Sequence, residues 1–323
     1  MMTTTNAATL VHSIGTHGQL EVRVASWDVE IVGVDGDEVR IRNADGGSLP
    51  RLDVERGAGS LRVAQPAHGI MISFGKSIEI RLTIEVPSKA RVAVQSASGN
   101  VEARGLRADQ RLRTASGDVR VQDSTGEIGL ETVSGDIDLA LDGAAELTVR
   151  SVSGDVSIDG GIATRLGLST TSGDLRVASQ LGTGPHSIST LSGDAWIAPG
   201  RGVRIVARTI SGDITTDLPH TSEGGPGRRT LTVGDGSTVV EFKSVSGDMR
   251  VVGRDPEDLR AFDRDIPAPP EPPVAPVPPL PPALPADASE ESHLAILQAL
   301  ERGEIDVAEA TDRLGRLDGA SDD

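Results

Sequence analysis

Hydrophobic and polar residues alternate with a period of two along most of the chain between residues 9 and 254. The runs over residues 20–24 and 78–84 are examples, and Gly-rich segments separate such runs from one another. Alternation of this kind places successive side chains on opposite faces of a strand and is typical of half-buried β-strands. The pattern therefore predicts an all-β fold made of many short strands.

A three-residue motif, Ser-Gly-Asp, recurs within this pattern at intervals of 18, 18, 19, 19, 20, 19 and 35 residues. Its copies are Ser98, Gly99 and Asn100; Ser116, Gly117 and Asp118; Ser134, Gly135 and Asp136; Ser153, Gly154 and Asp155; Ser172, Gly173 and Asp174; Ser192, Gly193 and Asp194; Ser211, Gly212 and Asp213; and Ser246, Gly247 and Asp248. Two positions before each motif Ser stands another hydroxyl residue: Ser96, Thr114, Thr132, Ser151, Thr170, Thr190, Thr209 and Ser244. The residues between these two hydroxyls are Ala97, Ala115, Val133, Val152, Thr171, Leu191, Ile210 and Val245.

This repetition predicts a parallel β-solenoid with rungs of about 19 residues, each a strand, a corner, a second strand and a return. Gly accepts the positive φ of a sharp corner, and the flanking Ser and Asp can hydrogen-bond local amides. Eight rungs stacked about 4.8 Å apart span about 34 Å. We expect the apolar residues to point to one face and the Ser/Thr columns to the other. Separate hairpins along a β-sandwich would also place turns at intervals, but they explain the constant corner less well.

The repeat divides the chain into four parts. Residues 1–95 are predicted to be an N-terminal β region with atypical first rungs, in which Ser26-Trp27-Asp28 is a degenerate corner. Residues 96–254 carry the regular repeats, with a protruding hairpin inserted at 218–240 between the last two. Residues 255–288 are predicted to form a disordered, Pro-rich linker, because their Pro content favours extended polyproline II. Residues 289–319 are predicted to form a small α-helical hairpin.

The predicted helical hairpin carries a stripe of leucines at helical spacing: Leu294, Leu297, Leu300, Leu314 and Leu317. A unit of about thirty residues has too little core to be stable alone. We therefore expect these leucines to bind a protein partner, or to pair with a second copy of the hairpin or with the solenoid.

Composition and charge narrow the possible partners. The chain has no Cys, only five aromatic residues and a net charge of −17. Most of the negative charge lies in residues 255–323, which contain 17 acidic and five basic residues. Without a basic stripe or stacking rings, nucleic acid is not expected as a partner. No apolar run approaches 18 residues and the start lacks a secretory pattern, so we expect a cytoplasmic protein without an integral membrane segment, with a peripheral membrane position left open.

The motif Asp residues are the most evident candidate for chemistry, because Ca²⁺ binds clustered carboxylate oxygens. Like charges about 4.8 Å apart repel by only about 0.9 kcal/mol in water, however, and local amides can offset the repulsion. We interpret the motif as a structural corner and expect no metal and no cofactor. The Ser/Thr columns are interpreted as a solvated face, with an ice-binding or glycan-binding surface as the alternative. Trp196 is expected to point outward beside its corner.

Enzymes that act on polysaccharides also occur among parallel β-helix folds, but catalysis needs groups with different roles and pKa values. A ladder of equivalent Asp residues offers no such division, and the six His residues are scattered. We assign no catalytic residue and expect no small-molecule ligand.

The repeated [Ser/Thr]-x-Ser-Gly-Asp-[Val/Ile]-x-[Val/Ile/Leu] unit resembles the bacterial DUF4097 family of β-strand-repeat proteins, often labelled putative adhesins, over about residues 10–254. Residues 297–310 resemble the SHOCT-like helical module that accompanies this family in some envelope-stress proteins. The resemblance implies a right-handed solenoid and a non-catalytic role. We therefore expect a scaffold or protein-interaction module linked to the cell envelope or stress response. A surface adhesin and a polysaccharide-active enzyme remain as alternatives.

Overall fold

The computed structural model describes residues 3–5, 8–66, 80–200, 202–225 and 227–253. All of its regular elements are β-strands, and most strand pairs are parallel, so the prediction of an all-β, mostly parallel fold is confirmed. Residues 1–261 form one compact unit, so the two regions predicted for 1–95 and 96–254 belong to the same body. The predicted linker and helical hairpin, with Leu294, Leu297, Leu300, Leu314 and Leu317, lie outside the described residues.

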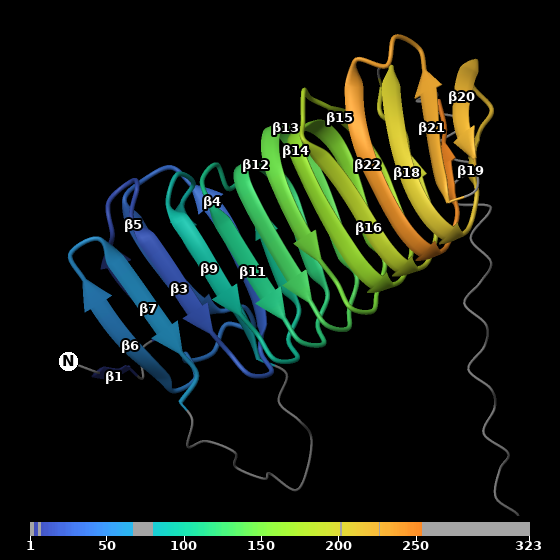
Figure 1. The fold of residues 1–323 in the computed structure, drawn as a ribbon. Helices are drawn as coiled ribbons and strands as arrows, with labels where there is room; N and C mark the ends of the chain where they lie inside the picture. The colour runs from blue at the N-terminus through green and yellow to red at the C-terminus, as the bar shows by residue number, and fades with distance from the viewer. Residues whose placement is uncertain (1–2, 6–7, 67–79, 201, 226, 254–323) are drawn as a thin grey trace, which may run out of the picture. The chain divides into compact units, whose positions relative to one another are not determined.

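The strands form two columns, here called face A and face B, which meet at the Ser-Gly-Asp corners (Figure 1). In stacking order face A contains β1 (Thr3–Thr5), β6 (Leu52–Gly57), β7 (Ser60–Ala64), β3 (Gln19–Arg23), β9 (Arg91–Gln95), β11 (Gln110–Thr114), the second halves of β12 (Val119–Thr132), β13 (Ile137–Arg150) and β14 (Val156–Ser172), then β16 (His186–Ser192), β22 (Thr238–Ser246), β18 (Val203–Ser211), β21 (Arg228–Val233) and β20 (His220–Gly225).

Face B is built in the same way from the strands that follow the corners. It contains β2 (Thr9–Ser13), β5 (Glu38–Asn43), β8 (Arg81–Pro87), β4 (Asp28–Val34), β10 (Val101–Arg104), the first halves of β12, β13 and β14, then β15 (Leu175–Leu181), β17 (Ala195–Ile197), β23 (Met249–Val251) and β19 (Ile214–Thr216). Each rung thus consists of one face A strand, a corner and one face B strand.

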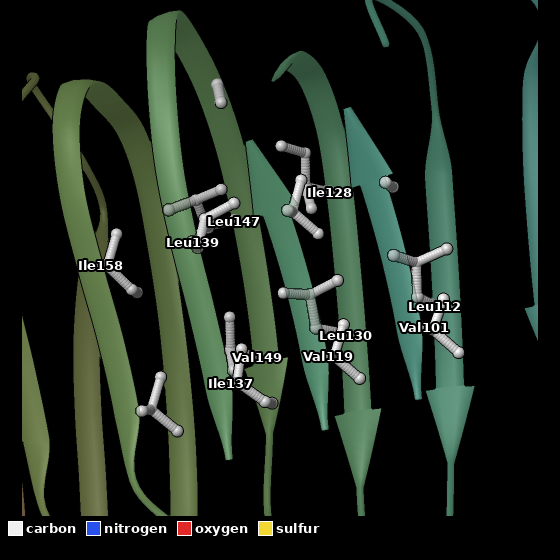
Figure 2. Packing of buried hydrophobic residues seen from close by; sticks show 14 of the residues in the cluster. Val101, Leu112, Val119, Ile128, Leu130, Ile137, Leu139, Leu147, Val149 and Ile158 are labelled. Carbon is white, nitrogen blue, oxygen red and sulfur yellow. The ribbon is translucent and has the colours of Figure 1, made fainter. Parts of the chain in front are cut away.

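The core lies between the two faces and is filled mainly by aliphatic side chains. Figure 2 shows Leu112, Leu130 and Val149 on face A strands opposite Val119 and Ile137 on face B strands. Every labelled residue in that view is fully or almost fully buried. Because one rung cannot bury its own apolar side chains, the stack acquires a core only through its neighbours.

The stacking order departs from the chain order at both ends of the stack. The rung β3–β4 pairs with β7–β8 on one side and with β9–β10 on the other, so the first rung of the sequence lies between the second and the third. At the other end β22 lies between β16 and β18 (Figure 1), and β23 lies between β17 and β19. The first and last rungs of the chain therefore have hydrogen-bonded neighbours on both edges.

Antiparallel strands extend the stack beyond these rungs. The hairpin β20–β21 falls within the predicted insertion at 218–240, but it does not protrude, because β21 pairs antiparallel with β18 and continues face A. At the opposite end β6 continues face A beyond β7, and β5 continues face B beyond β8. Unpaired backbone groups at a strand edge can pair with other strands. The antiparallel strands β1, β2 and β20 take three of the edge positions, and β19 forms the edge of face B beyond β23.

The corner glycines permit the close stacking of the rungs. From Gly135 onward their φ angles lie between 123° and 151°, where an L-residue is strained, and a Cβ at Gly154 would overlap the carbonyl oxygen of Gly135 in the rung below. Gly36 has a similar φ of 140°, but a Cβ there would meet no atom within 4 Å. A substitution at Gly36 therefore introduces backbone strain alone, whereas one at Gly154 introduces both backbone strain and overlap with the neighbouring rung.

We predict that Gly154→Ala destabilises the protein more than Gly36→Ala does. Backbone strain alone would cost about 1–3 kcal/mol at either site, and overlap with Gly135 would add about 1–3 kcal/mol at position 154. Urea denaturation followed by circular dichroism measures both losses. Equal losses in the two variants would show that the rungs are not held at the spacing described.

Candidate functional site

The motif Asp side chains form a continuous hydrogen-bond ladder along the corners. At each step the backbone N–H of one rung donates to the side-chain Oδ1 of the rung below, at 2.7–3.0 Å. The ladder runs through Asp28, Asn100, Asp118, Asp136, Asp155, Asp174, Asp194, Asp248 and Asp213. The degenerate corner at Ser26-Trp27-Asp28 thus supplies the first carboxylate, and the order 194, 248, 213 follows the exchanged rungs.

Each ladder side chain before Asp213 accepts a hydrogen bond from the backbone of the next rung, and one of them does so without a charge. Asn100 accepts from Asp118 N–H at 2.9 Å through its amide oxygen, so the bond needs an oxygen but no ion. Among the described residues no group of three or more His, Asp or Glu side chains is placed to hold a metal ion. The ladder geometry supports a structural role for the motif.

The Ser/Thr residues that precede the corner lie inside the stack, which corrects the prediction of a solvated hydroxyl face. Thr114, Thr132, Ser151, Thr170, Thr190 and Ser244 are all buried. They share the phase of the inward residues, as Ser151 does with Leu147 and Val149, so period two turns them toward the core. An ice-binding or glycan-binding surface made of this column is therefore wrong as well.

The residues between the motif Ser and the hydroxyl residue two positions before it point outward. The sequence pattern predicts that they point inward, because most of them are apolar. Ile210 is 82% exposed, and Val133, Val152, Leu191 and Val245 are 41–53% exposed. In stacking order the row is Ala97, Ala115, Val133, Val152, Thr171, Leu191, Val245 and Ile210, here called the ridge. Sequence reasoning missed it because residue type was given more weight than the phase of the alternation.

The ridge is anchored to the rungs by its backbone. The N–H groups of Ser116, Ser134, Ser153 and Ser172 donate to the carbonyls of the ridge residues of the rung below, at 2.8–3.0 Å. Exposed apolar side chains held in a row mark surfaces that bind other macromolecules more often than isolated exposed side chains do. The ridge is therefore a candidate interaction surface.

Face B carries a second feature near the corners. Trp196 is half-exposed, in keeping with the expected outward direction, and lies between Arg176 and Arg250 in the neighbouring rungs. The Arg176 guanidinium lies 5.4 Å from the centre of the Trp196 ring, within the range of a cation–π contact. Arg250 also pairs with Asp217 at 2.8 Å. This cluster is held by contacts among its own members.

A hollow of about 290 Å³ lies on face B at the other end of the ladder. Its lining includes Asp28 and Asp118 of the ladder, together with Glu102, Arg81 and Arg120. Both ladder carboxylates accept backbone hydrogen bonds, and Arg120 pairs with Asp138 at 3.2 Å. The two ladder carboxylates and Arg120 are thus engaged in contacts between neighbouring rungs.

The architecture defines a class of proteins, the all-β proteins whose mostly parallel strands stack as corner-linked rungs. The chain belongs to the Toastrack DUF4097 family, whose model matches residues 17–252. In the described residues there is no helix long and apolar enough to cross a membrane.

The solved structures that match the chain share little sequence with it. A "putative lipid binding protein" from Parabacteroides distasonis is 12% identical with a TM-score of 0.43, and the match covers 75% of this chain and 95% of that one. A "putative adhesin" from Bacteroides fragilis is 15% identical with a TM-score of 0.35 over the same shares. A "putative cell adhesion protein" from Clostridium sporogenes is 11% identical with a TM-score of 0.25, covering 76% and 98%. The comparison with curated proteins gives no match.

Burial distinguishes one member of the ladder electrostatically. Burial raises the pKa of Asp174 above 3.8, and the neighbouring carboxylates Asp155 and Asp194 raise it further, against the hydrogen bond from Asp194 N–H. A raised folded pKa means that the folded protein binds the proton more readily than the unfolded chain does. Ionisation of Asp174 therefore costs stability as the pH rises above 3.8 and through the folded pKa.

We predict that Asp174→Asn stabilises the protein at neutral pH, because the amide oxygen still accepts from Asp194 N–H and the charge is absent. Asp174→Ala should destabilise it by about 1–3 kcal/mol, since the backbone donor loses its partner. Thermal denaturation of the two variants beside the wild type measures both effects. If Asn and Ala lower the melting temperature equally, the ladder bond contributes nothing at this rung.

His186 is buried at the start of β16, and its Nε2 lies 3.1 Å from the carbonyl of Gly182, to which it donates. Nδ1 has no hydrogen-bond partner among the described atoms. Burial lowers the pKa of His186 below 6.5, although the bond to Gly182 opposes that shift. The unfolded chain takes up the proton first, so folding stability is lost as the pH falls through 6.5 toward the lower folded pKa.

We predict that the free energy of unfolding decreases between about pH 7.5 and about pH 5.5, and that His186→Leu reduces this decrease. Urea denaturation at the two pH values measures the difference. The exposed His220 provides the control, since His220→Leu should retain the full pH dependence. A pH dependence unchanged in His186→Leu would contradict the assignment.

Proposed function

We propose that the chain is a non-catalytic protein-interaction scaffold that presents the ridge to a protein partner. The observation that carries this proposal is the row of apolar side chains standing outward at the corners, led by Leu191, Val245 and Ile210. Their exposure to water is unfavourable by about 25 cal/mol for each Å² of apolar surface, and a partner that covers them removes this cost.

The rigidity of the stack supports this role. The ridge residues are spaced by the strand separation of about 4.8 Å, and hydrogen bonds on both sides of the corner fix their backbones. A preorganised surface loses little conformational entropy on binding. A protein partner would therefore meet a surface that is already in its binding arrangement.

The contact that the ladder carboxylates share supports a role without catalysis. Acid–base catalysis needs groups held in different protonation states by different surroundings. Asp118, Asp136 and Asp155 instead make the same backbone contact. An enzyme that acts on polysaccharides is the alternative that this uniformity favours least.

The C-terminal segment enters the proposal as a second contact element. Its leucines, Leu294 to Leu317, lie outside the described residues, and their helical spacing indicates an apolar stripe. We propose that the Pro-rich segment 255–288 tethers this stripe to the stack, so that a partner or a second copy can bind at both places. The family resemblance to envelope-stress proteins suggests where such a partner would be found.

The proposal predicts that protein capture depends on the ridge. Affinity-tagged full-length protein is expressed in its own host, and the bound proteins, untagged copies of the chain included, are identified by mass spectrometry. Leu191→Lys with Ile210→Lys should remove part of the captured set, because a charge on each side chain prevents apolar contact. Val239→Lys is the matched control, since Val239 is also exposed on face A but lies off the ridge. Identical sets from all three proteins would refute the ridge as a docking surface.

A further inference from the structure

We propose that the partner of the ridge is a second copy of this chain, bound parallel and in register about a two-fold axis that runs along the ridge. This inference rests on the proposed function, because it names the protein that covers the docking surface. It is carried by the charges on the two sides of the ridge, which differ in sign along most of its length.

The face A side of the ridge is basic, hydroxylic or amidic at seven of eight rungs. The residues three positions before the motif Ser are, in stacking order, Gln95, Arg113, Glu131, Arg150, Ser169, Ser189, Lys243 and Arg208. They lie on the outer surface of face A, and Arg113, Arg150, Lys243 and Arg208 are exposed. On the other side of the ridge stands the ladder, with a carboxylate at every rung except Asn100.

Symmetry decides which arrangement of two copies uses this difference. Two copies that meet ridge to ridge can be related by a two-fold axis along the ridge or by one across it. An axis across the ridge places ladder against ladder and arginine against arginine, which is repulsive. An axis along the ridge places the face A column of each copy against the ladder of the other, at the same rung. Charge complementarity therefore favours the parallel arrangement.

The rungs match one by one in this arrangement. Arg208 faces Asp213 of the second copy, Lys243 faces Asp248 and Arg150 faces Asp155. In the rung where the ladder has an amide in place of a carboxylate, Gln95 faces Asn100, so two neutral groups meet. Serines face Asp174 and Asp194, and a serine hydroxyl can donate to a carboxylate.

Glu131 is the exception, because it would face Asp136 of the second copy. Its carboxylate is already paired within the chain, to Arg113 at 3.0 Å and to Arg150 at 3.1 Å. The two guanidinium groups on either side compensate the charge of Glu131. The like-charge contact at this single rung is therefore weak compared with the favourable contacts on both sides of it.

The size of the surface sets the strength of the dimer. Eight rungs span about 34 Å, and the five residue steps from the face A column to the ladder span about 16 Å, so each copy buries about 500 Å². Stable interfaces bury about 800 Å² per partner, which predicts a weak, reversible dimer. In the parallel arrangement both chains leave β23 at the same end of the dimer.

The orientation is tested with single cysteines in the full-length chain, which has no Cys of its own. In the parallel dimer every ridge residue faces its own counterpart, so Ala97→Cys and Ile210→Cys should each form disulfide-linked dimers alone under mild oxidation. An antiparallel dimer would link these two variants only when they are mixed. Thr171→Cys, near the middle of the ridge, should link in either case, and Val239→Cys, off the ridge, should not link.

The pairing of charges is tested by exchange at the end of the ladder, where no further rung uses the carboxylate of Asp213. Arg229 of the same chain pairs with this carboxylate at 3.4 Å, so every protein compared carries Arg229→Gln. Arg208→Asp should weaken dimerisation about tenfold, since two symmetry-related pairs become repulsive at about 0.7 kcal/mol each. Arg208→Asp combined with Asp213→Arg should restore it. Sedimentation equilibrium of the full-length proteins over micromolar to millimolar concentrations measures the dissociation constants.

The outcomes separate this inference from the proposed function. Wild-type protein that stays monomeric at millimolar concentration, or cross-links found only in the mixed sample, would overturn the parallel dimer. Ridge-dependent capture of a different protein would then leave the scaffold function in place. Failure of the double variant to recover dimerisation would overturn the rung-by-rung pairing even if the cysteines link.

Discussion

The hydrogen bond from the backbone N–H of one motif residue to the side-chain Oδ1 of the motif residue in the rung below is the interaction on which the structure depends. It repeats at every corner from Asp28 to Asp213 at 2.7–3.0 Å. The bond forms only if the corners stack in register, and they do so because each Gly leaves room for the carbonyl oxygen of its neighbour. The Asp and the Gly of the motif thus both serve to stack the corners in register. A motif that looks like a chain of acidic sites is a means of stacking strands.

The same constraint produces the surface of the corner. Once the Asp and Gly positions are fixed, period two turns the preceding hydroxyls inward and leaves Val152, Leu191 and Ile210 outside. The ridge is therefore a consequence of the fold that the sequence can fill with any outward residue. It is filled here with apolar side chains, between a basic and hydroxylic column and an acidic one. That choice is not required for stacking, which is why we connect it with binding.

At both ends of the stack the order of the rungs differs from their order in the chain, and this gives the first and last rungs of the chain a neighbour on each edge. A terminal rung has a neighbour on one edge only, and its unpaired N–H and C=O groups fray or bind other strands. In this chain the first and the last rungs each lie between two others, and antiparallel strands cover both ends of face A and one end of face B. The last rung before the C-terminal segment is thereby held on both edges.

The sequence by itself determined the all-β class, the position of each corner and the rung length, because the Ser-Gly-Asp spacing and the period of two are local properties of the chain. It also indicated that Asp28 replaces a motif Asp and that Trp196 points outward. The neighbour of each rung was decided only in the tertiary structure, because the strands of all rungs have similar backbone edges. The rung of Ser246 therefore lies between those of Ser192 and Ser211, although Ser211 directly follows Ser192 in the order of the repeats. The direction of the hydroxyl and ridge residues was likewise decided there, because burial near a corner follows the phase of the strand and the space between the faces rather than the polarity of the side chain.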